Sequence, residues 1–293
     1  MEDIEIILVN DFSKDNTLQI IQKLKEKDPR IQIINNEKNM GTLYSRSIGV
    51  LYSKGEYITN LDHDDFLFDK DIFDVAYKAA KDPDGDFDII SFMHVSAKSY
   101  YSKTKEIRGC TIRIPHNFRV FQPELSTFMQ FGENGFRYFD YRIWAKLFKN
   151  EVYKNATNIL GSQRFSHFVT FTEDLIGLFV IANVAKSYKF IRKYGVFHLD
   201  DDFSASNIAT QESRIFSDIL FSDVIFDIGK NQHKKFSAMF LEKRTDISSE
   251  KNNKYLIEVL NKVLNSEYIE NKYKEKLEKK FANLLAKIKH KMI

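Results

Sequence analysis

Short apolar runs alternate with helical patterns through the first third of the chain, and this alternation limits the folds that it can adopt. β-Branched and apolar runs, each ending at a polar turn, occur at 4–9, 31–34 and 57–61. Helical patterns lie between these runs, the first of them ending before Pro29, and a helix over 72–80 and a strand over 88–95 continue the series. Strands that alternate with helices indicate a parallel sheet. The sequence therefore predicts an α/β fold whose central sheet is mostly parallel and flanked by helices.

The alternation of strand and helix patterns ends after residue 96. Residues 97–170 are rich in aromatic side chains without a clean period, which predicts short elements. A helix is expected after Thr172 and a strand or loop over 190–197, and the sequence pattern predicts helices from about residue 208 onward. We expect a main body over 1–207, divided near residue 96 into two halves, and a helical extension over 208–293.

Composition excludes several classes of protein. With 43% hydrophobic and 29% charged residues the chain is not disordered, and a formal charge of +3 is too balanced to indicate a nucleic-acid partner. The single cysteine, Cys110, excludes an internal disulfide and a CxxC redox pair. The N-terminus lacks a signal-peptide pattern and no stretch approaches the roughly 20 apolar residues of a membrane span, so a cytoplasmic location is expected.

Acidic clusters follow two of the predicted strands, around Asp11 and around Asp62. Ligands of open parallel α/β sheets bind beyond the carboxyl ends of the strands, so both clusters should face one cleft. In an extended segment Asp62 and Asp64 would point the same way and His63 elsewhere. Such carboxylates suit Mg²⁺ or Mn²⁺, which neutralises a departing diphosphate. The alternative is that the acids form turns or that Asp65 caps the next helix.

Five blocks of sequence, in order, resemble the motifs of the family 2 glycosyltransferases. Residues 4–17 resemble the nucleotide-binding segment of that family, and 61–65 its DxD motif. Its second block is matched at 39–41, 45–49 and 55–58, and its acceptor-side motifs are matched at 144–148 and 172–174. The resemblance runs from residue 4 to about residue 207. It implies a GT-A type fold and transfer of a sugar, with inversion, from a nucleotide diphosphate donor to a hydroxyl of a glycan or lipid-linked glycan.

The resemblance also implies roles on the donor side. Asp11 would pair with the nucleotide base, commonly uracil in this family, and Asn39 would join the donor site. Arg46 would lie near the base and phosphates. Asp62 would contact the ribose or the metal, and Asp64 would hold the Mn²⁺ or Mg²⁺.

On the acceptor side, Asp174 would be the general base and Glu173 would orient the acceptor. The chemistry agrees, because a sugar hydroxyl is a poor nucleophile and a carboxylate must take its proton as it attacks. Trp144 and Lys146 belong to an acceptor-side motif, with Trp144 either a core residue or a platform for a sugar ring. His198 lies where some members have a residue near the diphosphate, or is a structural histidine.

The chain departs from the family pattern in three ways. Asn10 replaces an acidic residue, Phe12 replaces a glycine, and the segment at residue 4 lacks the strand and helix that usually precede it. An inactive nucleotide-sugar-binding module is therefore an alternative. A DxD phosphatase or phosphotransferase of the haloacid dehalogenase type, with Asp62 as nucleophile and Asp64 as acid, is disfavoured by Phe66, where that family has Thr or Val.

The C-terminal segment is basic. Residues 250–293 carry a local excess of five positive charges. An amphipathic helix is expected with its apolar stripe at Tyr273, Leu277, Phe281, Leu284 and Ile288. We favour packing of this helix on the body with a solvated lysine face, and the alternative is peripheral contact with an anionic membrane surface.

Overall fold

A computed structural model of the chain describes most of the sequence. The described residues are 3–83, 85–97, 117–122, 131–132, 135–136, 142–169, 171–199, 210–229, 250–267 and 271–291, with 234, 237, 241 and 269. Cys110 lies outside them.

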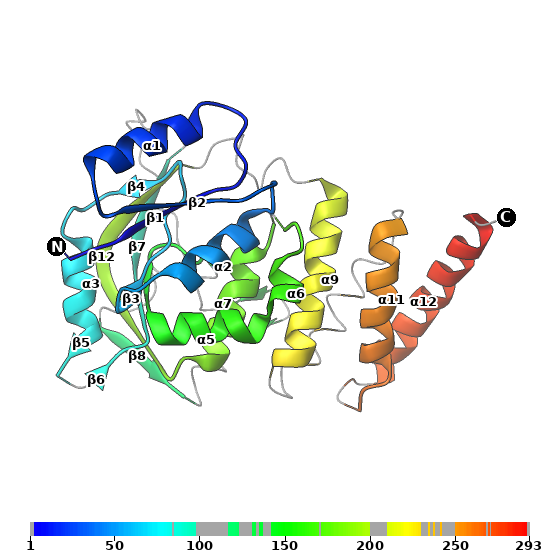
Figure 1. Cartoon of the computed structure of the whole chain (residues 1–293). Coiled ribbons are helices and arrows are strands. Elements are labelled where there is room, and N and C mark those ends of the chain that lie inside the picture. Colours follow the sequence, from blue (N-terminus) through cyan, green and yellow to red (C-terminus); the bar gives the residue numbers. More distant parts are fainter. Residues whose placement is uncertain are drawn as a thin grey trace.

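The N-terminal elements follow the predicted alternation (Figure 1). β1 (Ile6–Asn10) pairs in parallel with β2 (Ile31–Asn35), and α1 (Thr17–Lys27) connects them and ends before Pro29. α2 (Thr42–Tyr52) follows Gly41, whose φ of +87° is the left-handed conformation that glycine adopts most easily. α2 packs against β1 and buries Leu43 and Val50.

The largest sheet has six strands in the order β3 (Tyr57–Ile58), β11 (Lys146–Lys149), β7 (Ile89–Ala97), β12 (Ser187–Leu199), β4 (Phe66–Leu67), with β8 (Phe118–Phe121) also paired to β12. β7 and β12 run parallel, whereas the other pairs of this sheet are antiparallel. The α/β prediction is confirmed, but the prediction of a mostly parallel sheet is wrong here. The prediction assumed that each strand is joined to the next by a helix, which makes neighbouring strands parallel. β11 instead comes from much later in the chain and pairs antiparallel with both β3 and β7.

α3 (Ile72–Ala80) has the predicted bounds, and β12 extends the predicted strand at both ends. The register of β12 against β7 shifts on either side of Tyr194. A Cβ on the neighbouring Gly195 would lie 2.4 Å from Ile72 Cγ1 and 2.5 Å from Phe92 Cδ2. Glycine therefore lets α3 pack closely on the bulged strand.

The aromatic-rich middle of the chain contains a regular helix that the sequence analysis missed. α5 (Asn150–Leu160) buries Val152, Tyr153, Ala156, Thr157 and Leu160, a helical spacing that the surrounding aromatic residues obscured. Short α6 (Ser162–Phe165) follows, and α7 (Glu173–Val184) begins directly after Thr172 as predicted. Two small hairpins complete the described strands, β5 (Lys81–Asp82) with β6 (Gly85–Asp86) and β9 (Phe131–Gly132) with β10 (Gly135–Phe136).

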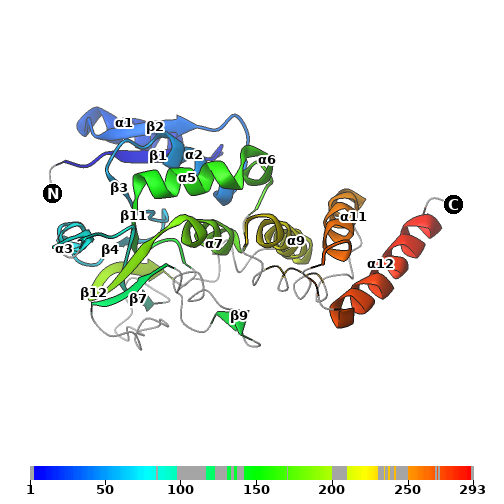
Figure 2. The same ribbon diagram turned by 90° about the horizontal axis from the view of Figure 1, so that it is seen from below.

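Three C-terminal helices continue the molecule away from the sheet: α9 (Gln211–Ile228), α11 (Glu250–Leu264) and α12 (Asn271–Lys291). In Figures 1 and 2 they follow α7 in a row, and the C-terminus lies at the opposite end from the N-terminus. Phe221 and Val224 of α9 join the main core, whereas Ile219 packs with Leu260 of α11 and Leu277 of α12 in a second cluster. Among the described residues, none of the helices has the length and apolar character that a membrane crossing requires.

Candidate active site

The DxD segment forms a turn. The Asp65 amide donates to the Asp62 carbonyl at 3.1 Å, so the prediction of an extended segment is wrong. The side chains of Asp62 and Asp64 are 29% and 27% exposed, whereas that of His63 is 98% exposed. Asp65 does not cap α3: its buried carboxylate accepts from the Leu199 amide at 3.0 Å. This bond ties the turn to the end of β12.

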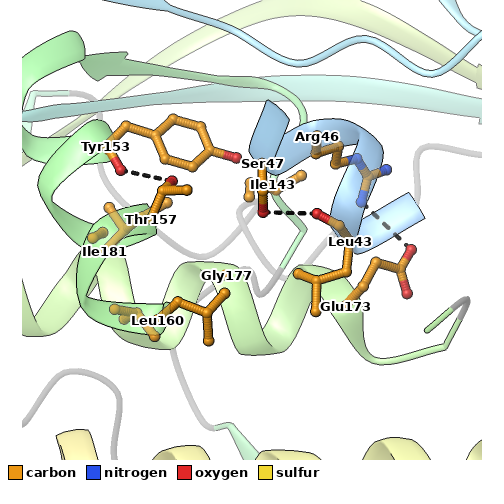
Figure 3. A pocket seen from close by; sticks show the side chains of 12 residues that line it. Leu43, Arg46, Ser47, Ile143, Tyr153, Thr157, Leu160, Glu173, Gly177 and Ile181 are labelled. Atoms are coloured by element: carbon orange, nitrogen blue, oxygen red, sulfur yellow. Dashed lines mark hydrogen bonds and ion pairs between the residues drawn. The ribbon is translucent and has the colours of Figure 1, made fainter. Parts of the chain in front are cut away.

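Arg46, on α2, lies at the centre of a group of carboxylates. Its Nη2 donates to Asp62 Oδ1 at 2.6 Å, and its Nη1 lies 3.4 Å from Glu173 Oε1 and also donates to Asp174 Oδ1. Figure 3 shows the Arg46 side chain reaching from α2 to Glu173 at the start of α7. The predicted donor-side and acceptor-side residues therefore meet at one guanidinium. We call Arg46, Asp62, Glu173 and Asp174 the arginine cluster.

Burial dominates the electrostatics of the arginine cluster. Burial, followed by the charge of Asp174, raises the pKa of Glu173 to about 7, with Arg46 opposing. Burial also raises the pKa of Asp174, again against the effect of Arg46. Burial alone would lower the pKa of Arg46, but Asp174, Asp62 and Glu173 raise it well above its ordinary value. Three carboxylates share one guanidinium, so the cluster carries excess negative charge when all of them are ionised. This charge favours binding of a proton or of a further cation.

Asp11 is tied to the loop that precedes α2. Its Oδ1 accepts from the Met40 amide and from Asn36 Nδ2, both at 2.8 Å, and its Oδ2 accepts from the Gly41 amide at 2.8 Å. The Oδ1 of Asn39 also accepts from the Gly41 amide, at 3.2 Å. The structure thus brings Asp11 and Asn39 together as expected. Asn36 was missed, although its place just after a predicted strand was a signal.

Trp144 and Lys146 are not presented to an acceptor in this structure. Trp144 is 3% exposed, and its ring stacks on His198 with centroids 4.6 Å apart. Lys146 is fully buried and donates to the Arg142 carbonyl at 2.5 Å. The burial arises because β11 is a central strand of the sheet. The acceptor-side roles of these two residues stay predictions. The charge of Lys146 nevertheless reaches Asp174, where it opposes the rise in pKa that burial causes.

His198 lies beside the DxD turn. Its Nδ1 is 3.0 Å from Asp65 Oδ1. Burial is the largest single influence and lowers the pKa of His198, but the hydrogen bond to Asp65 and the charges of Asp65 and Asp62 together outweigh it, and the net direction is upward. His94, which meets Trp144 edge-on at 4.8 Å, and Arg142, whose Nη1 is 2.9 Å from His94 Nε2, extend this group and were missed. Neither has a local sequence signal, because the sheet alone brings them to the site.

Backbone strain gathers beside the same residues. Phe12 (φ 60°), Ala145 (φ 54°) and Thr172 (φ 60°) adopt the left-handed conformation although none is glycine. They directly adjoin Asp11, Trp144 and Glu173. Strained backbone of this kind clusters at active sites and ligand clamps. The fourth such residue, Asn117, lies elsewhere in the chain.

The residues at the DxD turn fit a divalent cation completed by a ligand. Within the described ranges, no three His, Cys, Asp or Glu side chains gather closely enough to hold a metal ion by themselves. Burial raises the pKa of Asp64, and the charges of Asp65 and Asp62 act in the same direction. Carboxylate oxygens are the ligands that Mg²⁺ prefers, and Mg²⁺ typically combines one or two of them with substrate phosphates.

Sequence comparison then identifies the family. The profile described as Glycosyl transferase family 2 matches residues 1–158, more than half of the chain. The chain belongs to this family. Its donor-side blocks and the DxD turn fall inside the matched region.

Individual relatives agree. An uncharacterized glycosyltransferase of Haemophilus influenzae is 39% identical over 66 residues, which are 22% of this chain and 26% of that protein. The cholesterol galactosyltransferase of Borreliella burgdorferi is 27% identical over 247 residues, which are 82% of this chain and 66% of that protein. The chain thus spans about a quarter of the Haemophilus relative and two thirds of the Borreliella one.

A solved structure shares the fold. S. aureus TarS 1–349, in complex with UDP-GlcNAc, superposes with a TM-score of 0.61 at 14% identity, covering 96% of this chain and 80% of that one. At this identity the likeness shows the fold alone, and it confirms the predicted GT-A type.

Proposed function

We propose that this family 2 chain transfers a sugar, with inversion, from a UDP-sugar to a hydroxyl of a glycan or lipid-linked glycan. The observation that carries the proposal is the arginine cluster, in which Asp62 of the DxD turn and Asp174 at the start of α7 bind the same guanidinium. A donor and an acceptor bound at these two places would lie within reach of each other. The UDP-GlcNAc in the TarS complex supports UDP as the nucleotide.

In the proposed reaction the acceptor oxygen attacks the anomeric carbon of the donor while Asp174 takes the hydroxyl proton. The new C–O bond forms as the bond from the anomeric carbon to the phosphate oxygen breaks, and the diphosphate leaves with that electron pair. The Ile143 amide, 3.3 Å from Asp174 Oδ2, orients the base. Glu173 beside it would orient the acceptor.

Asp64 and Asp62 would hold Mn²⁺ or Mg²⁺, which when bound neutralises the departing diphosphate. Asp62 has one oxygen on Arg46, so its other oxygen and the Asp64 carboxylate are the candidates. Asp11 and Asn39 remain candidates for the base site, and His198 for the diphosphate. An inactive nucleotide-binding module is the second candidate function, and it differs from the first only in lacking turnover.

The test is titration with UDP in Mn²⁺ and in EDTA, read by Trp144 fluorescence or calorimetry, followed by turnover assays with UDP-sugars. We predict that Asp64→Asn loses metal-dependent binding, whereas Asp174→Asn keeps UDP binding and loses at least about 100-fold in transfer. His63→Ala is the matched control, because this exposed neighbour of both carboxylates should leave binding unchanged.

Equal loss of UDP binding in Asp64→Asn and Asp174→Asn would contradict the assigned roles. Metal-dependent binding without turnover on any UDP-sugar and acceptor would favour the inactive module. Absence of binding to every nucleoside diphosphate would overturn the donor site itself.

For the basic C-terminal helix we propose packing of its apolar stripe on the neighbouring helices of the extension, rather than on the main body. Leu277 of α12 is fully buried in the second cluster and Phe281 packs against the same cluster, so these two members of the apolar stripe are already covered. The side chains of Tyr273, Leu284 and Ile288 lie outside the described residues. Sedimentation with phosphatidylserine vesicles tests the alternative, and binding that salt abolishes would support it.

A further inference from the structure

The carboxylates that bind Arg46 would compete with the diphosphate of a donor for its guanidinium. Its side chain is 14% exposed, and those of Glu173 and Asp174 are 14% and 15% exposed. A carboxylate paired with a buried guanidinium is stabilised in its charged form and is therefore a weaker base. In the geometry without donor, the Arg46 guanidinium is bonded to Asp174 Oδ1 and therefore occupies an oxygen that should accept the acceptor proton.

A diphosphate is a strong competitor for this guanidinium. The planar fork of arginine matches phosphate oxygens in bidentate geometry, and charge-assisted bonds of this kind are about twice as strong as neutral ones. Asp62, at the donor-side end of the arginine cluster, already holds Nη2 at the place where the diphosphate is expected. The phosphate oxygens would therefore compete first for Nη2, whereas Glu173 and Asp174 hold Nη1.

The surroundings of Arg46 leave it more room toward the DxD turn than toward the core. A small cavity of about 20 Å³ lies between α2, α5 and α7, with Arg46 and Glu173 on its wall. Figure 3 shows both side chains at one end of this space, with Gly177 and the apolar side chains of Leu160 and Ile181 farther along it. This cavity holds about one water molecule and is too small for a rotated guanidinium. Arg46 has more room toward the DxD turn, where the side chain of Asp62 is 29% exposed.

We propose that Arg46 is a positioning residue that couples donor binding to release of the base. Without donor, Arg46 pairs with Asp174 and Glu173. When the diphosphate enters, Arg46 turns to the phosphate oxygens, and Asp174 Oδ1 is released to take the acceptor proton. The enzyme then activates an acceptor only when a donor is in place, which would limit activation of water in the empty site. This inference rests on the proposed function.

The decisive experiment is NMR of the guanidinium groups in the full chain labelled with ¹⁵N-arginine, without and with UDP and Mg²⁺. Arg46→Lys assigns the Arg46 resonance. The spectra of the wild type and of Asp174→Asn are then compared in both states. Arg164, which pairs with Asp223 and Asp227 away from the arginine cluster, provides an internal control whose resonance should not respond.

We expect the Arg46 resonance to differ between wild type and Asp174→Asn without UDP, and to coincide once UDP is bound. Asp174→Asn should also bind UDP about 3- to 10-fold more tightly, because no contact of Arg46 with Asp174 has to be broken. A difference that persists unchanged with UDP bound would show that Arg46 stays on Asp174 and would overturn the coupling. So would identical spectra in the free state.

Failure of UDP to bind either protein would instead overturn the proposed donor site, and the coupling with it. These results separate the two hypotheses. In the first case UDP binds and Arg46 does not move, whereas in the second no binding is seen at all.

Discussion

Glu173 shows at the scale of one residue what burial does to the chemistry of this site. Its pKa rises from an ordinary 4.5 to about 7, with burial the largest cause. The acid therefore binds more protons in the folded chain than in the unfolded one between these values. The free energy of unfolding must then fall as the pH rises through this window, because ionisation is disfavoured in the folded state.

We predict that Glu173→Gln removes this penalty. The free energy of unfolding of the variant, relative to wild type, should increase by on the order of 3 kcal/mol between about pH 5 and pH 8. Urea unfolding of both proteins across this range measures it. A difference that does not vary with pH would mean that the carboxyl group is solvated rather than buried.

Phe12 carries strain where a glycine is usual. With φ at 60° it adopts a conformation that disfavours large and β-branched side chains, and Lys14 Nζ lies 3.4 Å from its ring centroid. We predict that Phe12→Gly is more stable to urea than Phe12→Val by about 2 kcal/mol, since valine is strained in this region and glycine is not. Equal stability of the two variants would contradict the left-handed conformation.

Gly195 governs how two elements meet, because α3 packs on β12 at its irregular point. We predict that Gly195→Ala lowers the free energy of unfolding by about 1 to 3 kcal/mol, as the added methyl group meets Ile72 and Phe92. Gly49→Ala is the matched control. It lies within α2, where the new Cβ would stand 3.4 Å from Val9 Cγ2, and it should stabilise the chain by about 0.5 to 1 kcal/mol. Thermal unfolding of both variants gives the two signs, and a loss in both would refute the argument from close approach.

At the element level most of the regular structure was readable from sequence. α1, α3 and α7 lie where the sequence predicts helices, because apolar spacing and an early Pro29 act locally, although no side-chain hydrogen bond caps any of the three. α5 was not predicted, since its apolar positions are embedded among aromatic residues that belong to other contacts. The antiparallel entry of β11 was not predictable from alternation, which reports only strands that follow one another through helices.

At the scale of the whole molecule, a network of ion pairs around one buried carboxylate joins the main body to the C-terminal helices. Asp223 of α9, 5% exposed, accepts from Arg164 Nε at 2.9 Å, from Lys262 Nζ at 2.6 Å and from the Tyr255 hydroxyl at 3.0 Å. Burial opposes its ionisation, but the bonds from Lys262 and Arg164 lower the pKa of Asp223. Residues from α6, α9 and α11 thus share one carboxylate.

We predict that Asp223→Asn costs at least about 2 kcal/mol, because two cations lose a charged partner and a buried bond network is broken. Hydrogen exchange should place the loss in α9 and α11. Glu151→Gln, at an exposed ion pair with Lys149, is the control and should change little. Hydrogen-exchange protection of α9 and α11 that is the same in Asp223→Asn as in the wild type would show that the apolar clusters alone join these helices.

The sequence by itself determined the family, the α/β alternation and the identity of the acidic and basic residues at the site, because these depend on local spacing and on short motifs. Tertiary structure decided which of them meet. Asp62, Arg46 and Asp174 are far apart in the chain, and only the packing of α2 against α7 beside the DxD turn brings them to one guanidinium. It also decided that Trp144 and Lys146 are buried, since exposure depends on the neighbours that the sheet supplies. Periodicity reports which face of an element is apolar, but long-range contacts decide what covers that face.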